Sequence, residues 1–240
     1  MDFTLERERD ICSAYLDSSL HLGIVQSQLL VQDGITECFQ KLGCDGIIYR
    51  EQFNAFWVFT RIKIKFIKRP QWQDIVKIRT FPINNAGVRT CVNTEITDLH
   101  GNKLILANQE ACVLNLETRR PMRLTNLPFP RENFPEPVFN APFEKFNISD
   151  AAKVYEQRIH SQHIDMSKHT NNVEYAKFAL NVFSDDFLQN NEVKEAELHY
   201  LGESREGELL EIFHKQANDS VHFCQIRCGE RTVFEMSISF

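Results

Sequence analysis

Apolar residues recur along the chain with two different spacings, and these spacings predict its helices and strands. Ile35, Cys38, Phe39 and Leu42 fall at i, i+3, i+4 and i+7, with Val25 and Leu29 two turns earlier, which is typical of a helix with one buried face. Gly43 follows directly, where glycine often ends a helix because it accepts a left-handed backbone. Over residues 61–66 apolar and polar residues alternate strictly, which predicts a strand.

The two halves of the chain repeat one order of predicted elements. In the first half, a short segment near 8–18 and the helix precede strand patterns at 56–66, 75–81, 88–97 and 103–116. In the second half, a strand at 153–164 and a helix at 171–188 precede strand patterns at 193–200, 208–216, 221–227 and 232–240. This order predicts an α+β protein of two tandem units that form a pseudo-dimer. In each unit an antiparallel sheet wraps around one long helix.

Proline separates the two units. Six of the eight prolines lie between Pro121 and Pro142, and proline neither donates a backbone hydrogen bond nor tolerates a helix before it. We therefore predict an extended connection over 121–148, which separates an N-terminal unit, 1–120, from a C-terminal unit, 149–240.

Composition narrows the classes of protein. The formal net charge is -6, so no broad basic face is expected and nucleic acid is not an expected partner. No apolar run approaches the roughly 18 residues of a membrane span, and the charged N-terminus does not resemble a signal peptide. The seven cysteines include no Cys-x-x-Cys pair, which favours reduced thiols over disulfides or zinc. We expect a cytoplasmic protein without a bound metal.

Chemically active side chains gather where the second predicted helix begins. Asp165, Ser167 and His169 occupy a short loop, and Asn171 can cap the helix that follows. A helix start offers unpaired N–H groups that can stabilise an oxyanion, and a base beside it could hydrolyse an activated acyl group. The same residue types are also common in turns and caps, so the pattern alone leaves a well-capped helix as the alternative.

A family resemblance adds to this pattern. The string Asp-Met-Ser-Lys-His-Thr-Asn-Asn-Val-Glu-Tyr at 165–175 resembles the Asp-x-Asn-x-His-x-Asn-Asn-x-x-Tyr signature of the plant and bacterial acyl-acyl carrier protein thioesterases, which are double-hotdog enzymes. Residues 193–204, 113–121 and 88–104 are similar to further segments of that family. Together these segments extend the resemblance over most of the chain, roughly residues 8–240.

The resemblance implies an activity and a set of site residues. The reaction would be hydrolysis of the thioester that joins a fatty acyl chain to acyl carrier protein, without a cofactor. Four side chains would take part in catalysis: Asp165, Ser167, His169 and Glu203. Backbone N–H groups at the helix start, at Asn171 and Asn172, would hold the thioester oxygen.

Two positions depart from the family pattern. Ser167 stands where the family has asparagine, and a hydroxyl lacks the two-ended grip of an amide. Ser204 follows Glu203 where many relatives have cysteine, so a cysteine nucleophile is excluded at this position. We therefore favour attack by a water that Glu203 and His169 activate, and we expect Ser204→Ala to retain most activity.

The resemblance implies that the first unit holds the acyl chain rather than catalyses. Its corresponding stretch, 16–23, repeats the spacing of Asp165 and His169 in Asp17 and His21, but no Asn-Asn follows. Four aromatic residues are candidates for lining a tunnel, although core packing is the commoner role of such residues on strands: Phe53, Phe56, Trp57 and Phe59.

A basic strand in the first unit is a candidate docking surface. Arg61, Lys63 and Lys65 share one face of the predicted strand, and such a strip could attract an acidic carrier protein. A solvated strand face that discourages edge pairing is the alternative.

Two other functions stay open, as does the oligomeric state. One is an acyl-CoA thioesterase on the same fold, and the other is a non-catalytic acyl-binding protein. Further pairing of the chain into a homodimer is also open.

Overall fold

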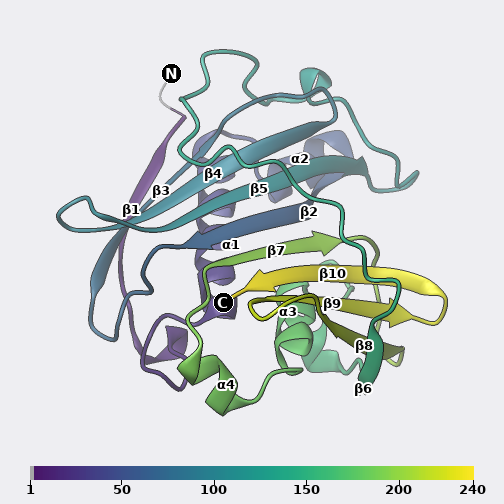
Figure 1. The fold of residues 1–240 in the computed structure, drawn as a ribbon. Coiled ribbons are helices and arrows are strands. Elements are labelled where there is room, and N and C mark those ends of the chain that lie inside the picture. The colour runs from purple at the N-terminus through teal and green to yellow at the C-terminus, as the bar shows by residue number, and fades with distance from the viewer. Residues whose placement is uncertain (1–2) are drawn as a thin grey trace. The chain divides into compact units, whose positions relative to one another are not determined.

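The computed structural model describes residues 3–240, which form two compact units, 3–142 and 143–240. Each unit is an antiparallel sheet with a helix packed on it (Figure 1). The predicted α+β fold of two tandem hotdog units is therefore confirmed. The division lies inside the predicted 121–148 connection, so most of this connection belongs to the first unit.

In the first unit the strands lie in the order β1-β3-β4-β5-β2, and neighbouring strands run antiparallel. Their bounds are β1 Leu5–Asp10, β2 Ala55–Phe66, β3 Ile75–Pro82, β4 Arg89–Asp98 and β5 Lys103–Asn115. A register shift between Phe59 and Arg61 marks an irregularity within β2, which covers the predicted 56–66 strand. The strands predicted from alternation are confirmed.

Helix α1, Ile24–Lys41, has the buried face that the apolar spacing predicts, and it packs against β3. Its buried side chains include Leu30, Val31 and Ile35, and Gly43 beyond its end has the expected positive φ of 68°. Gly34 lies so close to β3 that a Cβ atom placed there would be 2.7 Å from the Thr80 hydroxyl. Helix and sheet therefore approach closely at this point.

A second helix in the first unit, α2, Gly46–Phe53, was not predicted. Asp45 caps it by accepting hydrogen bonds from the N–H groups of Ile47 and Ile48 at 2.7 and 3.1 Å. Asn54 ends the helix in the left-handed conformation. The capping residue was visible in the sequence, but eight residues are too few to show helical periodicity.

The proline-rich connection is fastened to the first unit. It contains one short 3-10 helix, Leu124–Asn126, and Phe129 packs edge-on against Phe39 with ring centroids 6.0 Å apart. Asn93 on β4 accepts hydrogen bonds from the N–H groups of Val138 and Phe139, each at 3.0 Å. Side chains of the first unit thus hold a segment that forms no strand of its own.

In the second unit the strands lie in the order β7-β10-β9-β8-β6, again antiparallel. Their bounds are β6 Ala152–Arg158, β7 Glu195–Tyr200, β8 Leu209–Gln216, β9 Val221–Cys228 and β10 Arg231–Ser239. The four predicted C-terminal strands are confirmed. The first strand, β6, ends six residues before the predicted 153–164 segment does, because residues 161–163 form a 3-10 helix.

The single long helix predicted at 171–188 is wrong. The chain forms α3, Asn172–Leu180, and a separate short helix, α4, Asp185–Asn190. Ser184 starts α4 by accepting a hydrogen bond from the Phe187 N–H at 3.1 Å. The helical spacing at 171–188 predicts Phe183 and Phe187 on one face, and the two rings still stack on each other although the helix is interrupted.

Two histidines of the second unit lie in contact with each other. Nε2 of His214 lies 3.0 Å from Nδ1 of His222, and Phe183 packs edge-on against both rings. Burial lowers the pKa of both histidines, and for His214 the neighbouring His222 lowers it further. The folded protein therefore favours the neutral rings.

Thermal stability should therefore fall as the pH is lowered through about 6.5, the ordinary histidine pKa. Below that pH the unfolded chain binds protons that the folded chain resists, and above it the contribution is fully present. Melting temperatures of wild type and His214→Gln between about pH 7.5 and 5 test this expectation. Equal slopes for the two proteins would exclude the pair as the cause.

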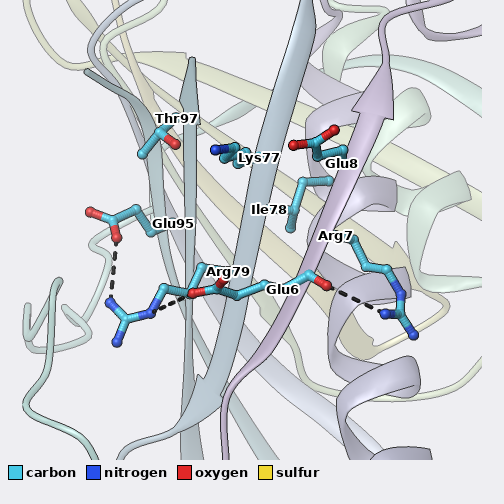
Figure 2. A pocket seen from close by; sticks show the side chains of 8 residues that line it. All are labelled: Glu6, Arg7, Glu8, Lys77, Ile78, Arg79, Glu95 and Thr97. Carbon is cyan, nitrogen blue, oxygen red and sulfur yellow. Dashed lines mark hydrogen bonds and ion pairs between the residues drawn. The ribbon is translucent and has the colours of Figure 1, made fainter. Parts of the chain in front are cut away.

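A shallow hollow on the first unit carries charges of both signs. Figure 2 shows Glu6 of β1, Arg79 of β3 and Glu95 of β4 side by side, with Arg79 3.8 Å from Glu6 and 3.6 Å from Glu95. These side chains pair with one another across the strands instead of pointing at a common centre. We assign the hollow no chemistry.

Candidate active site

The loop before α3 brings Asp165 and His169 together through its own backbone. The Asp165 N–H donates to the His169 carbonyl at 3.0 Å, and the Lys168 N–H donates to the Asp165 carbonyl at 3.0 Å. Lys168 takes a positive φ of 65° to close this turn. The spacing of four residues thus places the two side chains at the base of one tight loop.

Hydrogen bonds link the four predicted catalytic side chains in a row. The Ser167 hydroxyl donates to Oδ1 of Asp165 at 2.5 Å, and its oxygen lies 3.4 Å from Nδ1 of His169. On the other side of the ring, Nε2 of His169 lies 3.1 Å from Oε2 of Glu203. Glu203 comes from the segment after β7, so the fold closes a gap of 34 residues in the sequence to form this pair.

Solvent reaches this row at its carboxylate end. The Glu203 side chain is 42% exposed and that of His169 is 15% exposed. A carboxylate next to an imidazole, both open to water, can accept a proton from an attacking water molecule. This geometry supports chemistry as well as capping.

Of the two predicted oxyanion donors at the start of α3, one N–H group already donates to a carbonyl within the protein. The Asn171 N–H donates to the His163 carbonyl at 2.8 Å, while the Asn171 side chain accepts from the Val173 N–H at 3.1 Å. The Glu174 N–H donates to the Asn171 carbonyl. Asn171 is therefore the helix cap and not an oxyanion donor, and Asn172 remains the candidate donor in this turn.

Ser204 is fully buried beside the site. Its hydroxyl lies 2.7 Å from that of Thr170 and 2.8 Å from that of Tyr175. Neither neighbour is a base, and burial raises the pKa of Tyr175, which keeps it a neutral phenol. The position after Glu203 is therefore unsuited to nucleophilic attack on a substrate.

The first unit contains a copy of this loop, at the stretch where Asp17 and His21 repeat the spacing of Asp165 and His169. The Asp17 N–H donates to the His21 carbonyl at 2.9 Å, and Leu20 takes a φ of 61°. The Ser19 hydroxyl donates to Asp17 at 2.5 Å and lies 3.2 Å from Nδ1 of His21. Residues 17–23 thus correspond to 165–171 with a constant offset.

Arginine replaces the carboxylate in this copy. The Leu22 N–H donates to the Pro70 carbonyl as the Thr170 N–H does to Ser204, so Arg69 stands where Glu203 stands in the second unit. Arg69 pairs with Asp17. Burial would raise the pKa of Asp17, but the Ser19 hydroxyl and Arg69 outweigh it and hold that pKa low. Without a carboxylate at this place, the copy lacks the candidate base.

The predicted docking strip on β2 is not a continuous exposed surface. Lys63 is only 4% exposed, and its amine donates to the Pro142 carbonyl at 3.2 Å. Arg61 lies 3.9 Å from Glu110, whereas Lys65 is exposed. Alternation correctly placed the three cations on one face, but the connection covers Lys63, so the three-residue docking surface is wrong.

A buried pair that the sequence analysis did not identify lies on β7. Nε2 of His199 is 2.7 Å from Oε1 of Glu197, and both residues are buried. The same carboxylate oxygen accepts a hydrogen bond from the Glu144 N–H at 2.7 Å, and Phe146 stacks on the His199 ring. The sequence signal that could have identified this pair is that Glu197 and His199 lie two residues apart on one predicted strand. Their contacts hold residues 144–146, the start of the second unit, against β7.

Two further types of site are absent from the part of the chain that the structure describes. Residues 3–240 contain no group of three His, Cys, Asp or Glu side chains arranged to hold a metal ion. No helix in the same residues has the length and apolar character needed to cross a bilayer.

Family models match both units of the chain. The model of the acyl-ACP thioesterase N-terminal domain matches residues 4–127, and that of the C-terminal domain matches residues 148–232. Among curated proteins, the chain is 25% identical over 174 residues to oleoyl-acyl carrier protein thioesterase 2, chloroplastic, of Arabidopsis thaliana. This match covers 67% of the chain and 47% of that protein, so the chain spans about half the length of the curated relatives it matches.

Solved structures show the same fold over the full chain. An acyl-ACP thioesterase from Bacteroides thetaiotaomicron is 18% identical, with a TM-score of 0.90 over 99% of this chain and 98% of that one. The 12:0-ACP thioesterase from Umbellularia californica is 15% identical, with a TM-score of 0.85 over 100% of this chain and 97% of that one.

Proposed function

Because this chain belongs to the acyl-ACP thioesterase family, we propose that it hydrolyses the thioester of a fatty acyl-acyl carrier protein and releases the free fatty acid. The observation that carries the proposal is the 3.1 Å contact between His169 and Glu203 beside the start of α3. It pairs a solvent-accessible base with a helix end that can stabilise negative charge. A loop that served only to cap α3 would not need the Glu203 carboxylate beside His169.

In the proposed reaction, Glu203 and His169 take a proton from water as its oxygen attacks the thioester carbonyl carbon. The Asn172 N–H donates to the carbonyl oxygen as it becomes negative, which lowers the energy of the tetrahedral intermediate. Collapse of this intermediate breaks the carbon–sulfur bond. The proton then passes from the Glu203–His169 pair to the departing sulfur, leaving a carboxylic acid and a thiol.

Asp165 and Ser167 orient the histidine in this scheme. The serine hydroxyl is held by Asp165 at 2.5 Å and faces Nδ1 of His169, the ring atom opposite Glu203. The serine, which is shorter than the asparagine of the family signature, lies 3.4 Å from this ring atom. We assign both residues to positioning the ring.

Carrier-protein and CoA substrates of one chain length distinguish the alternatives. We expect kcat/KM for the acyl-acyl carrier protein to exceed that for the acyl-CoA by about 10-fold or more, because the carrier protein adds contacts outside the thioester. Higher activity on acyl-CoA would favour the CoA thioesterase function. Binding of both without hydrolysis would instead identify a non-catalytic acyl-binding protein.

The proposal places the reaction in a reducing compartment, the cytoplasm. Its support is that the seven cysteines are free thiols, four of them buried: Cys38, Cys44, Cys112 and Cys224. The expected partner is acyl carrier protein, and a homodimer is left open.

A further inference from the structure

Three hydroxyl groups form a buried cluster behind the proposed catalytic pair. Ser204 is 0% exposed, Thr170 is 4% exposed and Tyr175 is 1% exposed. The Ser204 hydroxyl lies 2.7 Å from the Thr170 hydroxyl and 2.8 Å from the Tyr175 hydroxyl. The Thr170 hydroxyl also donates to the Ser204 carbonyl at 3.1 Å. The tyrosine can donate to the serine and the serine to the threonine, so every hydroxyl has a partner.

The cluster joins the two segments that carry His169 and Glu203. Thr170 directly follows His169, and Ser204 directly follows Glu203. The Thr170 N–H adds a backbone hydrogen bond of 2.8 Å to the Ser204 carbonyl. Each catalytic side chain is therefore one residue away from a point at which the two segments are bonded to each other.

The duplicated loop of the first unit shows that the loop folds without this cluster. There Leu22, Pro70 and Ser27 stand at the positions of Thr170, Ser204 and Tyr175. The backbone bond persists, with the Leu22 N–H 2.7 Å from the Pro70 carbonyl. Ser27 bonds instead to the Gly23 carbonyl within its own helix. The cluster accompanies the histidine–glutamate pair and is not needed for the turn.

We propose that Thr170, Tyr175 and Ser204 are positioning residues, whose buried hydroxyl cluster holds the Glu203 carboxylate at hydrogen-bonding distance from His169. This inference rests on the proposed function, because it takes the Glu203–His169 pair to be catalytic. Glu203 lies beyond the end of β7 with a side chain that is 42% exposed, so its position depends on the anchoring of its own backbone. Small displacements of a catalytic group are costly to the rate.

The inference changes the expectation for Ser204→Ala, which the sequence alone predicts to retain most activity. Ser204→Ala and Tyr175→Phe should each lower kcat about 10-fold with KM nearly unchanged, because the carboxylate is displaced but the acyl chain still binds. In a Glu203→Gln background, Ser204→Ala should lower kcat no further, because the cluster acts through that carboxylate. Ser27→Ala is the matched control, since it removes a buried hydroxyl at the corresponding position and should leave kcat unchanged.

Nuclear magnetic resonance of the His169 ring tests the inference without a substrate. In Ser204→Ala the ring signals should move toward their positions in Glu203→Gln, and in Ser27→Ala they should stay in place. Unchanged ring signals in folded Ser204→Ala, or an equal loss of kcat in both Glu203 backgrounds, would overturn the positioning role. Absence of any thioester hydrolysis by wild type would count against the proposed function, whereas the ring signals would still decide the positioning role.

Discussion

His169→Ala is expected to lower kcat on a fatty acyl-acyl carrier protein about 100-fold or more, which is about 3 kcal/mol of transition-state stabilisation. The ring lies 3.1 Å from Glu203, so its removal takes away one member of the proton-accepting pair and loosens the other. Glu203→Ala should cause a loss of similar size. Single-turnover rates with one acyl-acyl carrier protein measure both effects.

The duplicated loop supplies the control for this experiment. His21 has the same loop, the same serine contact and the same spacing from its aspartate, but Arg69 stands in place of the carboxylate. His21→Ala should therefore leave kcat unchanged. A large loss in His21→Ala would mean that the first unit takes part in the chemistry, and near-normal turnover in folded His169→Ala would remove that residue from the mechanism.

Gly34→Leu is expected to destabilise the protein by at least about 3 kcal/mol, because the close contact between α1 and β3 leaves no room for a side chain. Even a Cβ atom would lie 2.7 Å from the Thr80 hydroxyl. Thr80 cannot move away easily, since it is fully buried and its hydroxyl lies 3.1 Å from that of Thr94. Urea denaturation followed by circular dichroism measures the loss.

Gly46 offers the matched substitution in the same unit. It begins α2, and a Cβ atom at this position would have no neighbour within 4 Å, so Gly46→Leu should be nearly neutral. If Gly34→Leu yields no folded protein, Gly34→Ala supplies the measurement, with an expected loss of about 1 kcal/mol after its gain in helix propensity. Wild-type stability in Gly34→Ala would show that the contact relaxes freely.

Sequence patterns predicted an element correctly where the period and the end signal both lay within that element. The three-and-four spacing before Leu42 and the glycine after it predict α1 because both depend only on the helix period and its end. The same reasoning failed at 171–188, where the apolar face continues across two helices. Ser184 and the two aspartates after it were a capping signal, and that signal outweighed the periodicity.

Strand alternation predicted which face a side chain occupies but not what covers that face. Lys63 shares a face with Arg61 and Lys65, as expected from a period of two. Its burial depends on the connection, which reaches Lys63 through the Pro142 carbonyl 79 residues later in the sequence. Long-range packing of this kind leaves no trace in the local sequence pattern.

The two-unit α+β order and, through the family signature, the residues of the candidate site could be predicted from local patterns in the amino-acid sequence. How these residues meet depends on long-range packing, which brings Glu203 to His169, leaves Asn171 as a cap and places Ser204 in a buried hydroxyl cluster. The structure also shows that the first unit repeats the loop with Arg69 where the carboxylate belongs. Helix period, strand period and capping are local properties of the chain, whereas contacts between segments tens of residues apart exist only once the sheet has formed.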